Sequence, residues 1–380
     1  MKLLVLCPTL DMKKPFSATP YIRQLLKGFK DQNCEILTIP YSGQASHSPW
    51  WTSYENPNYG KSEFLEKILK LTQHKNGKKN LPAIPLFAKL FAKPKIEKLI
   101  KQIILEHDDI IGILIIALPL NQITGLATNI KKFFNKPIIY YDVDLPTSLP
   151  ENGGFTFNYY LGADLTEYDS FLITSEGSTK RIKELGAVSV ESVHFGIDPE
   201  ICSPINIQKD IDVFFFGHGG NTRKKNISMM ISEPSKKLPY NFVMGGRDYN
   251  FDLGKANYSM SEINYSKWRE FSCRSKINLN VVHGLHAETY ATSTVRPFEL
   301  ASMGCCIVSS PYSGLENWFD LKKEVLIASN SEESIEIYKN LIEDEELRLK
   351  IGNAAKLRIQ KEHTVQHRAK QILEIIKKHE

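Results

Sequence analysis

Short apolar, β-rich runs alternate with segments of helical periodicity along most of this chain, a pattern typical of parallel α/β domains. The runs Ile110–Leu118 and Ser170–Thr174 are apolar almost throughout, as expected of strands that helices cover on both faces. After Asp198-Pro199 the alternation begins again with the strand-like run Ile211–Phe216. The pattern predicts an α/β chain of two successive halves, each built around a parallel sheet.

The predicted elements follow from these runs and from turn residues. We expect strands at Lys2–Cys7, Cys34–Ile39, Ile110–Leu118, Pro137–Asp142, Ser170–Thr174, Ile211–Phe216, Tyr240–Met244, Lys276–Val281 and Cys305–Ser309. We expect helices at Ala18–Phe29, Asn121–Phe134, Glu176–Leu185, Lys224–Lys237, Pro297–Met303 and Ser331–Lys378, the last with breaks at Gly352 and His363-Thr364. The predicted domains are residues 1–195, residues 196–360 and a C-terminal helix at 361–380 that packs back on the first domain.

Composition narrows the class of protein. Of 380 residues, 42% are hydrophobic and 24% charged, which excludes a disordered or fibrous chain. The net charge of +5 and pI of about 8.6 are milder than those of a typical nucleic-acid-binding domain. The six cysteines form no CxxC pair, and no apolar run has the length of a signal peptide or a membrane span. These features predict a cytoplasmic protein.

Two stretches interrupt the alternation. Residues 41–59 are rich in aromatic residues, serine, asparagine and proline, and we expect a long loop that either contacts an acceptor or packs its aromatic rings onto the domain. Residues 75–101 interleave lysines with Ile84, Leu86, Phe87, Leu90 and Phe91. This basic amphipathic segment fits either peripheral contact with an anionic membrane or a solvated helix face.

The segment Asn278–Phe319 is the richest in functional signals. A strand leads to Ser293 and Thr294, and Arg296-Pro297 then opens a helix whose first turn contains Glu299. Hydroxyls and a guanidinium beside a helix N-terminus can bind a phosphate, and Glu299 can accept hydrogen bonds from a ribose diol. The alternative is a capped helix with a surface Arg–Glu pair. His283 and His286 lie three residues apart nearby, and most histidines are expected to be structural or exposed.

Two strand ends in the second half carry glycines and basic residues. The strand Ile211–Phe216 runs into Gly217 and a turn containing Arg223, and a second strand ends in two glycines followed by Arg247. Such turns allow backbone amides to approach an anion, and the ends of strands line the ligand crevice of open α/β sheets. The spacing is not GxGxxG, which argues against a nicotinamide or flavin site.

In the first half, the sequence YYDVDLP places Asp142 and Asp144 at the end of a strand. Alternate residues point the same way on an extended strand, so both carboxylates can face one cleft. One of them can serve as a general base, or the pair can ligate a divalent cation, or both can cap local turns. No HExxH, GxSxG or Walker-type motif occurs, which argues against hydrolases and P-loop enzymes.

The motifs together resemble a known family. Ser293–Phe319, followed by KEVLIASNSEES and KEHTVQHRAKQIL, looks like the C-terminal signature of glycosyltransferases of the spore-maturation CgeB type. The stretches YYDVDLPTSL and Leu161–Pro204 resemble one branch of that family. The matches are in order over most of Tyr140–Leu373. The resemblance implies a GT-B architecture, with two Rossmann-like domains facing across a cleft and a helical C-terminal tail.

The resemblance also implies roles for the residues above. The second half would bind a nucleoside-diphosphate-sugar, with UDP as the first choice and GDP as the second, and no other cofactor or metal is required. The diphosphate and ribose would be held by Gly217, Arg223, Arg247, Ser293, Thr294, Arg296 and Glu299. The first half would bind the acceptor, with Asp142 or Asp144 facing the anomeric centre.

The chain departs from the family pattern at two positions. Leu145 stands where the branch favours threonine, and Ala291 stands where the retaining GT-B subtype has the first of two glutamates eight residues apart in sequence. The stereochemistry of transfer is therefore open. We predict a metal-independent glycosyltransferase acting on a hydroxyl acceptor. The alternatives are a phage-type sugar transferase that modifies DNA and a non-catalytic GT-B-like protein that binds a nucleotide or glycan.

Overall fold

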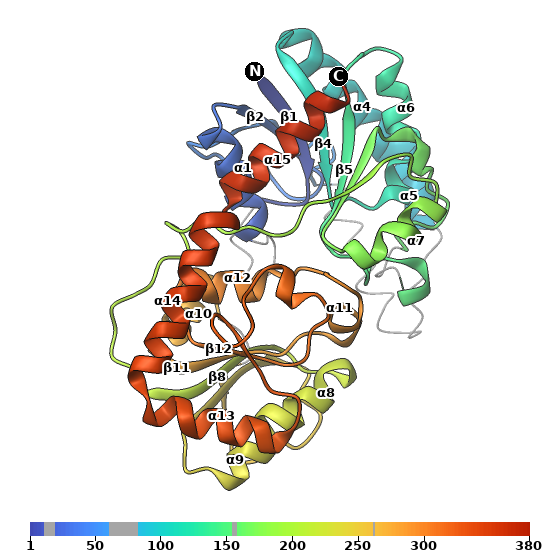
Figure 1. Ribbon diagram of the computed structural model, residues 1–380. Coiled ribbons are helices and arrows are strands. Elements are labelled where there is room, and N and C mark those ends of the chain that lie inside the picture. Colours follow the sequence, from blue (N-terminus) through green and yellow to red (C-terminus); the bar gives the residue numbers. More distant parts are fainter. Residues whose placement is uncertain (11–19, 61–82, 154–157, 261–262) are drawn as a thin grey trace. The chain divides into compact units, whose positions relative to one another are not determined.

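The computed structural model describes residues 1–10, 20–60, 83–153, 158–260 and 263–380 (Figure 1). The chain forms two compact units. Unit 1 consists of Met1–His194 and Arg368–Glu380, and unit 2 consists of Phe195–His367. The start of the first predicted helix, residues 18–19, and the lysine-rich residues 75–82 lie outside the described residues.

Unit 1 contains a seven-stranded parallel sheet in the order β3-β2-β1-β4-β5-β6-β7. Its strands are β1 (Lys2–Cys7), β2 (Glu35–Pro40), β3 (Thr52–Ser53), β4 (Ile110–Ile116), β5 (Ile138–Asp142), β6 (Ser170–Ile173) and β7 (Val190–Ser192). The five predicted strands are confirmed. The edge strands β3 and β7 were not predicted, because they have two and three residues whose side chains are only partly buried or exposed.

The helices of unit 1 are α1 (Pro20–Asp31), α3 (Ala83–Phe87), the π-helical segment η1 (Ala88–Ala92), α4 (Lys93–Glu106), α5 (Leu120–Ile123), α6 (Leu126–Lys131), α7 (Thr179–Glu184) and, from Arg368 on, α15 (Val365–Lys378). The continuous helix predicted over Asn121–Phe134 is wrong. It is interrupted at Gly125, whose φ is +83° and whose N–H donates to Glu167 Oε1 at 2.5 Å. The buried Glu167 carboxylate thus satisfies the amide at which α6 begins.

The predicted loop over residues 41–59 contains β3 and a buried indole. Trp51 donates from Nε1 to the Ser46 carbonyl oxygen at 2.8 Å, and the Arg23 guanidinium lies 5.3 Å from the centre of its ring system. Tyr41 donates to Gln122 Oε1 at 2.7 Å. These contacts match the interpretation in which the aromatic rings of the loop pack onto the domain.

Unit 2 contains a six-stranded parallel sheet in the order β10-β9-β8-β11-β12-β13. Its strands are β8 (Ile211–His218), β9 (Phe242–Arg247), β10 (Asn257–Met260), β11 (Ser275–Asn280), β12 (Ile307–Ser309) and β13 (Leu326–Ile327). Its helices are α8 (Asn221–Ile227), the π-helical segment η5 (Ser228–Ser232), α9 (Glu233–Lys237), α10 (Tyr265–Arg274), α11 (Gly284–Glu288), α12 (Val295–Ser302), α13 (Ser331–Glu343) and α14 (Glu345–Glu362). The four predicted strands are confirmed, and β10 and β13 at the edges were not predicted.

The helical tail breaks at Asp344 and at His363-Thr364, not at Gly352. The Asp344 side chain caps α14 by accepting from the Leu347 N–H at 2.8 Å. Gly352 lies inside α14, where a Cβ atom would be 2.2 Å from the Gly304 carbonyl oxygen. The glycine therefore permits close packing of α14 on the turn after α12. The predicted break at His363-Thr364 is confirmed.

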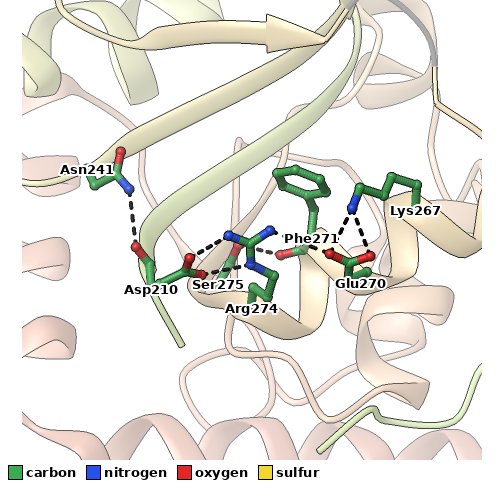
Figure 2. Close-up of polar contacts among 7 residues, drawn as sticks. All are labelled: Asp210, Asn241, Lys267, Glu270, Phe271, Arg274 and Ser275. Atoms are coloured by element: carbon green, nitrogen blue, oxygen red, sulfur yellow. Dashed lines mark hydrogen bonds and ion pairs between the residues drawn. The ribbon is translucent and has the colours of Figure 1, made fainter. Parts of the chain in front are cut away.

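A polar cluster holds the start of β8 against the end of α10 (Figure 2). Arg274 forms a bidentate ion pair with Asp210, with Nε donating to Oδ1 at 2.9 Å, and its guanidinium also lies over the Phe271 ring. Asn241 donates to the Asp210 carbonyl oxygen at 3.2 Å. The cluster therefore fixes the chain where it enters β8, at the amino ends of the strands.

Candidate functional site

The carboxyl ends of β8 and β9 touch through their glycines. Gly246 has a φ of +118°, and a Cβ atom there would lie 1.6 Å from the Gly217 carbonyl oxygen. Tyr249 donates to this oxygen at 2.7 Å. The glycines are therefore required by the close approach of two backbones.

The amides of the glycine turn are bonded within the protein. The Gly219 N–H donates to the Arg247 carbonyl oxygen at 2.7 Å, and the Gly220 N–H donates to the Asp248 carbonyl oxygen at 2.8 Å. The sequence predicts that amides of this turn approach an anion, but in this conformation these two are occupied. The positive charge near the turn comes from side chains instead.

Arg223 connects the ends of two strands. Its Nε donates to the Val281 carbonyl oxygen at 3.1 Å, just after β11, and its Nη1 donates to the His218 carbonyl oxygen at 3.1 Å, at the end of β8. Burial, with the nearby charge of Arg296, lowers the pKa of Arg223. Arg223 is thus a structural tie that also adds positive charge to the same end of the sheet as Arg296.

Arg296 and Glu299 lie one turn apart on α12. The Arg296 guanidinium is 4.1 Å from the Trp268 ring centre, and its Nη1 is 3.5 Å from Glu299 Oε2. The Arg296 side chain remains 33% exposed, whereas that of Glu299 is only 7% exposed. Burial raises the pKa of Glu299, and the Arg296 charge opposes this shift. The guanidinium is therefore held in place and still open to a ligand.

The N-terminus of α12 is not capped by its own preceding side chain. Thr294 is the N-cap residue, yet it makes no side-chain capping hydrogen bond. The Ser293 hydroxyl instead accepts from the Phe195 N–H at 3.2 Å. The helix starts at Val295, two residues earlier than predicted, so Arg296 belongs to its first turn. Arg296 and the Thr294 hydroxyl thus lie at a helix end that favours anions.

Two histidines after β11 lie near Arg223. The rings of His283 and His286 are T-shaped, with centres 5.5 Å apart. Both Nδ1 atoms are buried and have no hydrogen-bond partner among the described residues. Burial and the Arg223 charge lower both pKa values, that of His286 to about 4. Both imidazoles are therefore neutral at pH 7. The sequence predicted most histidines to be structural or exposed, and the position of these two shortly before Arg296 was the signal that set them apart.

In unit 1, Asp142 is a fully engaged carboxylate at the end of β5. Its Oδ2 accepts from Tyr160 at 2.5 Å and from Ser148 at 2.8 Å, and its Oδ1 accepts from the Asp144 N–H at 2.8 Å. Its side chain is buried, which raises its pKa against the effect of these hydrogen bonds. Asp142 therefore organises the loop that follows β5.

Asp144 has the opposite environment. It is half-buried, and its carboxylate accepts no hydrogen bond from the part of the chain that the structure describes. Burial and the neighbouring charge of Asp142 raise its pKa to about 7. A carboxylate with this pKa can accept a proton near neutral pH, which distinguishes Asp144 from Asp142 as a candidate base.

Two features that the site could have are a cluster that holds a metal ion and a glutamate at position 291. The described residues contain no group of three or more histidine, cysteine or acidic side chains placed to hold a metal ion. Both Asp142 oxygens already accept hydrogen bonds. Ala291 is fully buried, with its backbone against Gly314, so this position presents no side chain to a ligand.

Comparison with known proteins identifies the fold. Residues 223–374 match the family described as "Glycosyl transferase-like". No curated protein sequence matches. A sucrose-phosphate synthase from Thermosynechococcus elongatus is 12% identical, with a TM-score of 0.64 over 100% of this chain and 99% of that one. The chain has the GT-B fold.

Two other GT-B structures agree. Anabaena Alr3699/HepE in complex with UDP-glucose is 11% identical, with a TM-score of 0.62 and full coverage of both chains. The trehalose-6-phosphate synthase OtsA is 14% identical, with a TM-score of 0.63 over 99% of each chain. The predicted pair of parallel-sheet Rossmann-like units is therefore confirmed. No helix in the described ranges is long and apolar enough to cross a bilayer.

Proposed function

We propose that this GT-B protein is a glycosyltransferase that moves a sugar from a nucleoside-diphosphate-sugar to a hydroxyl acceptor. The observation that carries the proposal is the exposed Arg296 guanidinium, fixed over Trp268 in the first turn of α12. It lies in the segment that matches the glycosyl transferase-like family. The fold shared with sucrose- and trehalose-phosphate synthases supports the same reaction class.

UDP is the proposed donor nucleotide and GDP the alternative. Similar structures are described in complex with UDP, with UDP-glucose and with UDP-2-fluoro glucose. Glu299 would accept hydrogen bonds from the ribose hydroxyls while Arg296 meets the diphosphate. The diphosphate would be surrounded by Gly217, Arg223, Arg247, Ser293 and Thr294. Arg223 would act through its charge, because its Nε and Nη1 already donate hydrogen bonds to carbonyl oxygens at the ends of two strands.

The chemistry follows from where charge develops. The acceptor oxygen bonds to the anomeric carbon, the bond from that carbon to the diphosphate oxygen breaks, and the acceptor proton moves to a base. The negative charge gained by the diphosphate would be stabilised by Arg296 and the N-terminus of α12. Asp144 is the proposed base because its carboxylate accepts no hydrogen bond from the described residues and has a pKa of about 7. Asp142 would position the Asp144 loop.

We also propose a role for each unit, a subfamily and a reaction that needs no metal. Unit 1 would bind the acceptor and unit 2 the donor, and the CgeB type is the proposed subfamily because of its match to the terminal motifs. The reaction would require no metal, because no three histidine, cysteine or acidic side chains lie together in the described ranges to hold one. Transfer should then persist in EDTA, and its loss, with recovery on adding Mg²⁺, would refute metal independence.

Replacing Arg296 tests the donor site. R296A should reduce transfer by 100-fold or more, since single charge-stabilising donors contribute about 10²–10³ in rate. The matched control is R274A, which removes an arginine that also lies over an aromatic ring, on α10 (Figure 2). R274A should transfer sugar at the wild-type rate when both variants are assayed at a temperature at which they are folded. Wild-type transfer by R296A would refute the proposal.

A further inference from the structure

A patch of large apolar side chains is exposed on the short helical segment before α4. Leu86, Phe87, Leu90 and Phe91 are 59%, 38%, 59% and 56% exposed. They recur at positions i, i+1, i+4 and i+5, which places them on one side of α3 and η1, and the Phe87 and Phe91 ring centres are 4.7 Å apart. Contiguous exposed apolar side chains of this size mark interaction sites rather than ordinary surface.

The opposite side of this segment is fixed to unit 1. Ala88 is buried, and the Ala92 carbonyl oxygen accepts from Asn58 Nδ2 at 3.1 Å. The following helix α4, labelled in Figure 1, buries Ile96, Ile100 and Ile103 in the core of unit 1. The apolar patch is therefore presented to solvent by a segment that is anchored on its other side.

The surroundings of the patch are strongly basic. Residues 83–101 contain five lysines and one acidic residue, Glu97. Lys101 pairs with Glu97, and Lys93 donates to the Thr124 carbonyl oxygen. Lys89, Lys95 and Lys98 form no ion pair among the described residues. Apolar side chains interleaved with lysines are the composition of helices that lie in the surface of anionic membranes.

We propose that this patch docks unit 1 on an anionic lipid bilayer, with the two phenylalanines and two leucines in the acyl boundary and the lysines on lipid phosphates. Charge argues against a second copy as the occupant. A symmetric dimer through this patch would bring two lysine-rich segments together with one glutamate each. The inference concerns unit 1 alone and does not depend on the proposed donor site.

Vesicle sedimentation of the full chain tests the docking. Wild-type protein should sediment with vesicles of phosphatidylcholine and phosphatidylglycerol (3:1), at least tenfold more than with pure phosphatidylcholine, and should be released by 0.5 M salt. L90E/F91E should lose at least tenfold in bound fraction, and K89E/K95E/K98E should lose the preference for phosphatidylglycerol. The control L349E/L357E changes two exposed leucines on α14 and should bind like the wild type.

Three results would overturn the proposal. The first is a wild-type protein that sediments equally with and without phosphatidylglycerol, and the second is an L90E/F91E variant that binds like the wild type. The third is a dimer in light scattering that L90E/F91E converts to a monomer, without any vesicle binding by the wild type, which would assign the patch to a second copy. Unchanged melting temperatures of the variants verify that they are folded.

Discussion

Asp142 and Asp144 differ by two positions in sequence and by their hydrogen bonds in the structure. Period-two alternation placed both carboxylates on one side of a strand, but Asp144 lies beyond the end of β5. The partners that immobilise Asp142 are Ser148 and Tyr160, six and 18 residues away. Sequence spacing could identify the pair, but it could not show which carboxylate is free, because that depends on tertiary contacts.

The raised pKa of Asp144 predicts how the rate of sugar transfer depends on pH. If Asp144 is the base, kcat should rise with pH through about 7, because only the deprotonated carboxylate accepts the acceptor proton. D144N should lose about 10²–10⁴ in kcat and keep UDP affinity. The measurement is initial rate against pH between 5 and 9. A flat profile, or full activity in D144N, would exclude Asp144.

Stability provides a second test at the same residue. A carboxyl whose pKa is about 7 in the folded protein and about 3.9 in the unfolded chain binds more protons when folded between these values. Its contribution to stability is therefore lost as pH rises from about 4 to 7. D144N removes this effect, so its melting temperature should exceed that of the wild type at pH 8 and approach it at pH 4. Equal melting temperatures at pH 8 would contradict the raised pKa.

At the scale of elements, sequence patterns located the long buried strands and missed the short edge strands. β1, β4, β5 and β8 carry long apolar runs, whereas β3 and β13 have two residues each. Helix interruptions were harder to predict than strands. A glycine interrupts a helix here only where its φ is positive, and the sequence does not show the sign of φ. Gly125 does so and Gly352 does not; the latter serves packing against Gly304.

The close approach of β8 and β9 at Gly217 and Gly246 predicts that a larger residue at position 246 destabilises the protein. G246A places a methyl group against the Gly217 carbonyl oxygen and also strains a φ of +118°. It should cost at least about 3 kcal/mol in free energy of unfolding. The control G162A has a φ of +71° and open space around it, so it should cost about 1–2 kcal/mol. Urea denaturation measures both, and an equal loss would show that the backbone contact contributes nothing.

At the scale of the molecule, the restart of the α/β alternation after Asp198-Pro199 predicted two sheets, and the structure contains one in each unit. The C-terminal residues 368–380 belong to unit 1, where Gln371 donates to the Ser192 carbonyl oxygen at 3.1 Å. Local patterns could give the number of units. The proposed donor site rests on motifs around α12 that are visible in the sequence. The hydrogen bonds of the glycine-turn amides and of Arg223 could not be predicted, since both depend on neighbouring strands.

Nucleotide binding tests most directly whether unit 2 holds a nucleoside-diphosphate-sugar. The melting temperature should be measured with UDP, GDP, ADP, CMP and TDP in turn. A ligand at 100 times its Kd stabilises the folded state by about 2.7 kcal/mol, so UDP, or GDP in its place, should raise the melting temperature by several degrees. R296A should abolish that shift. No shift with any of the five nucleotides would contradict the proposed donor site.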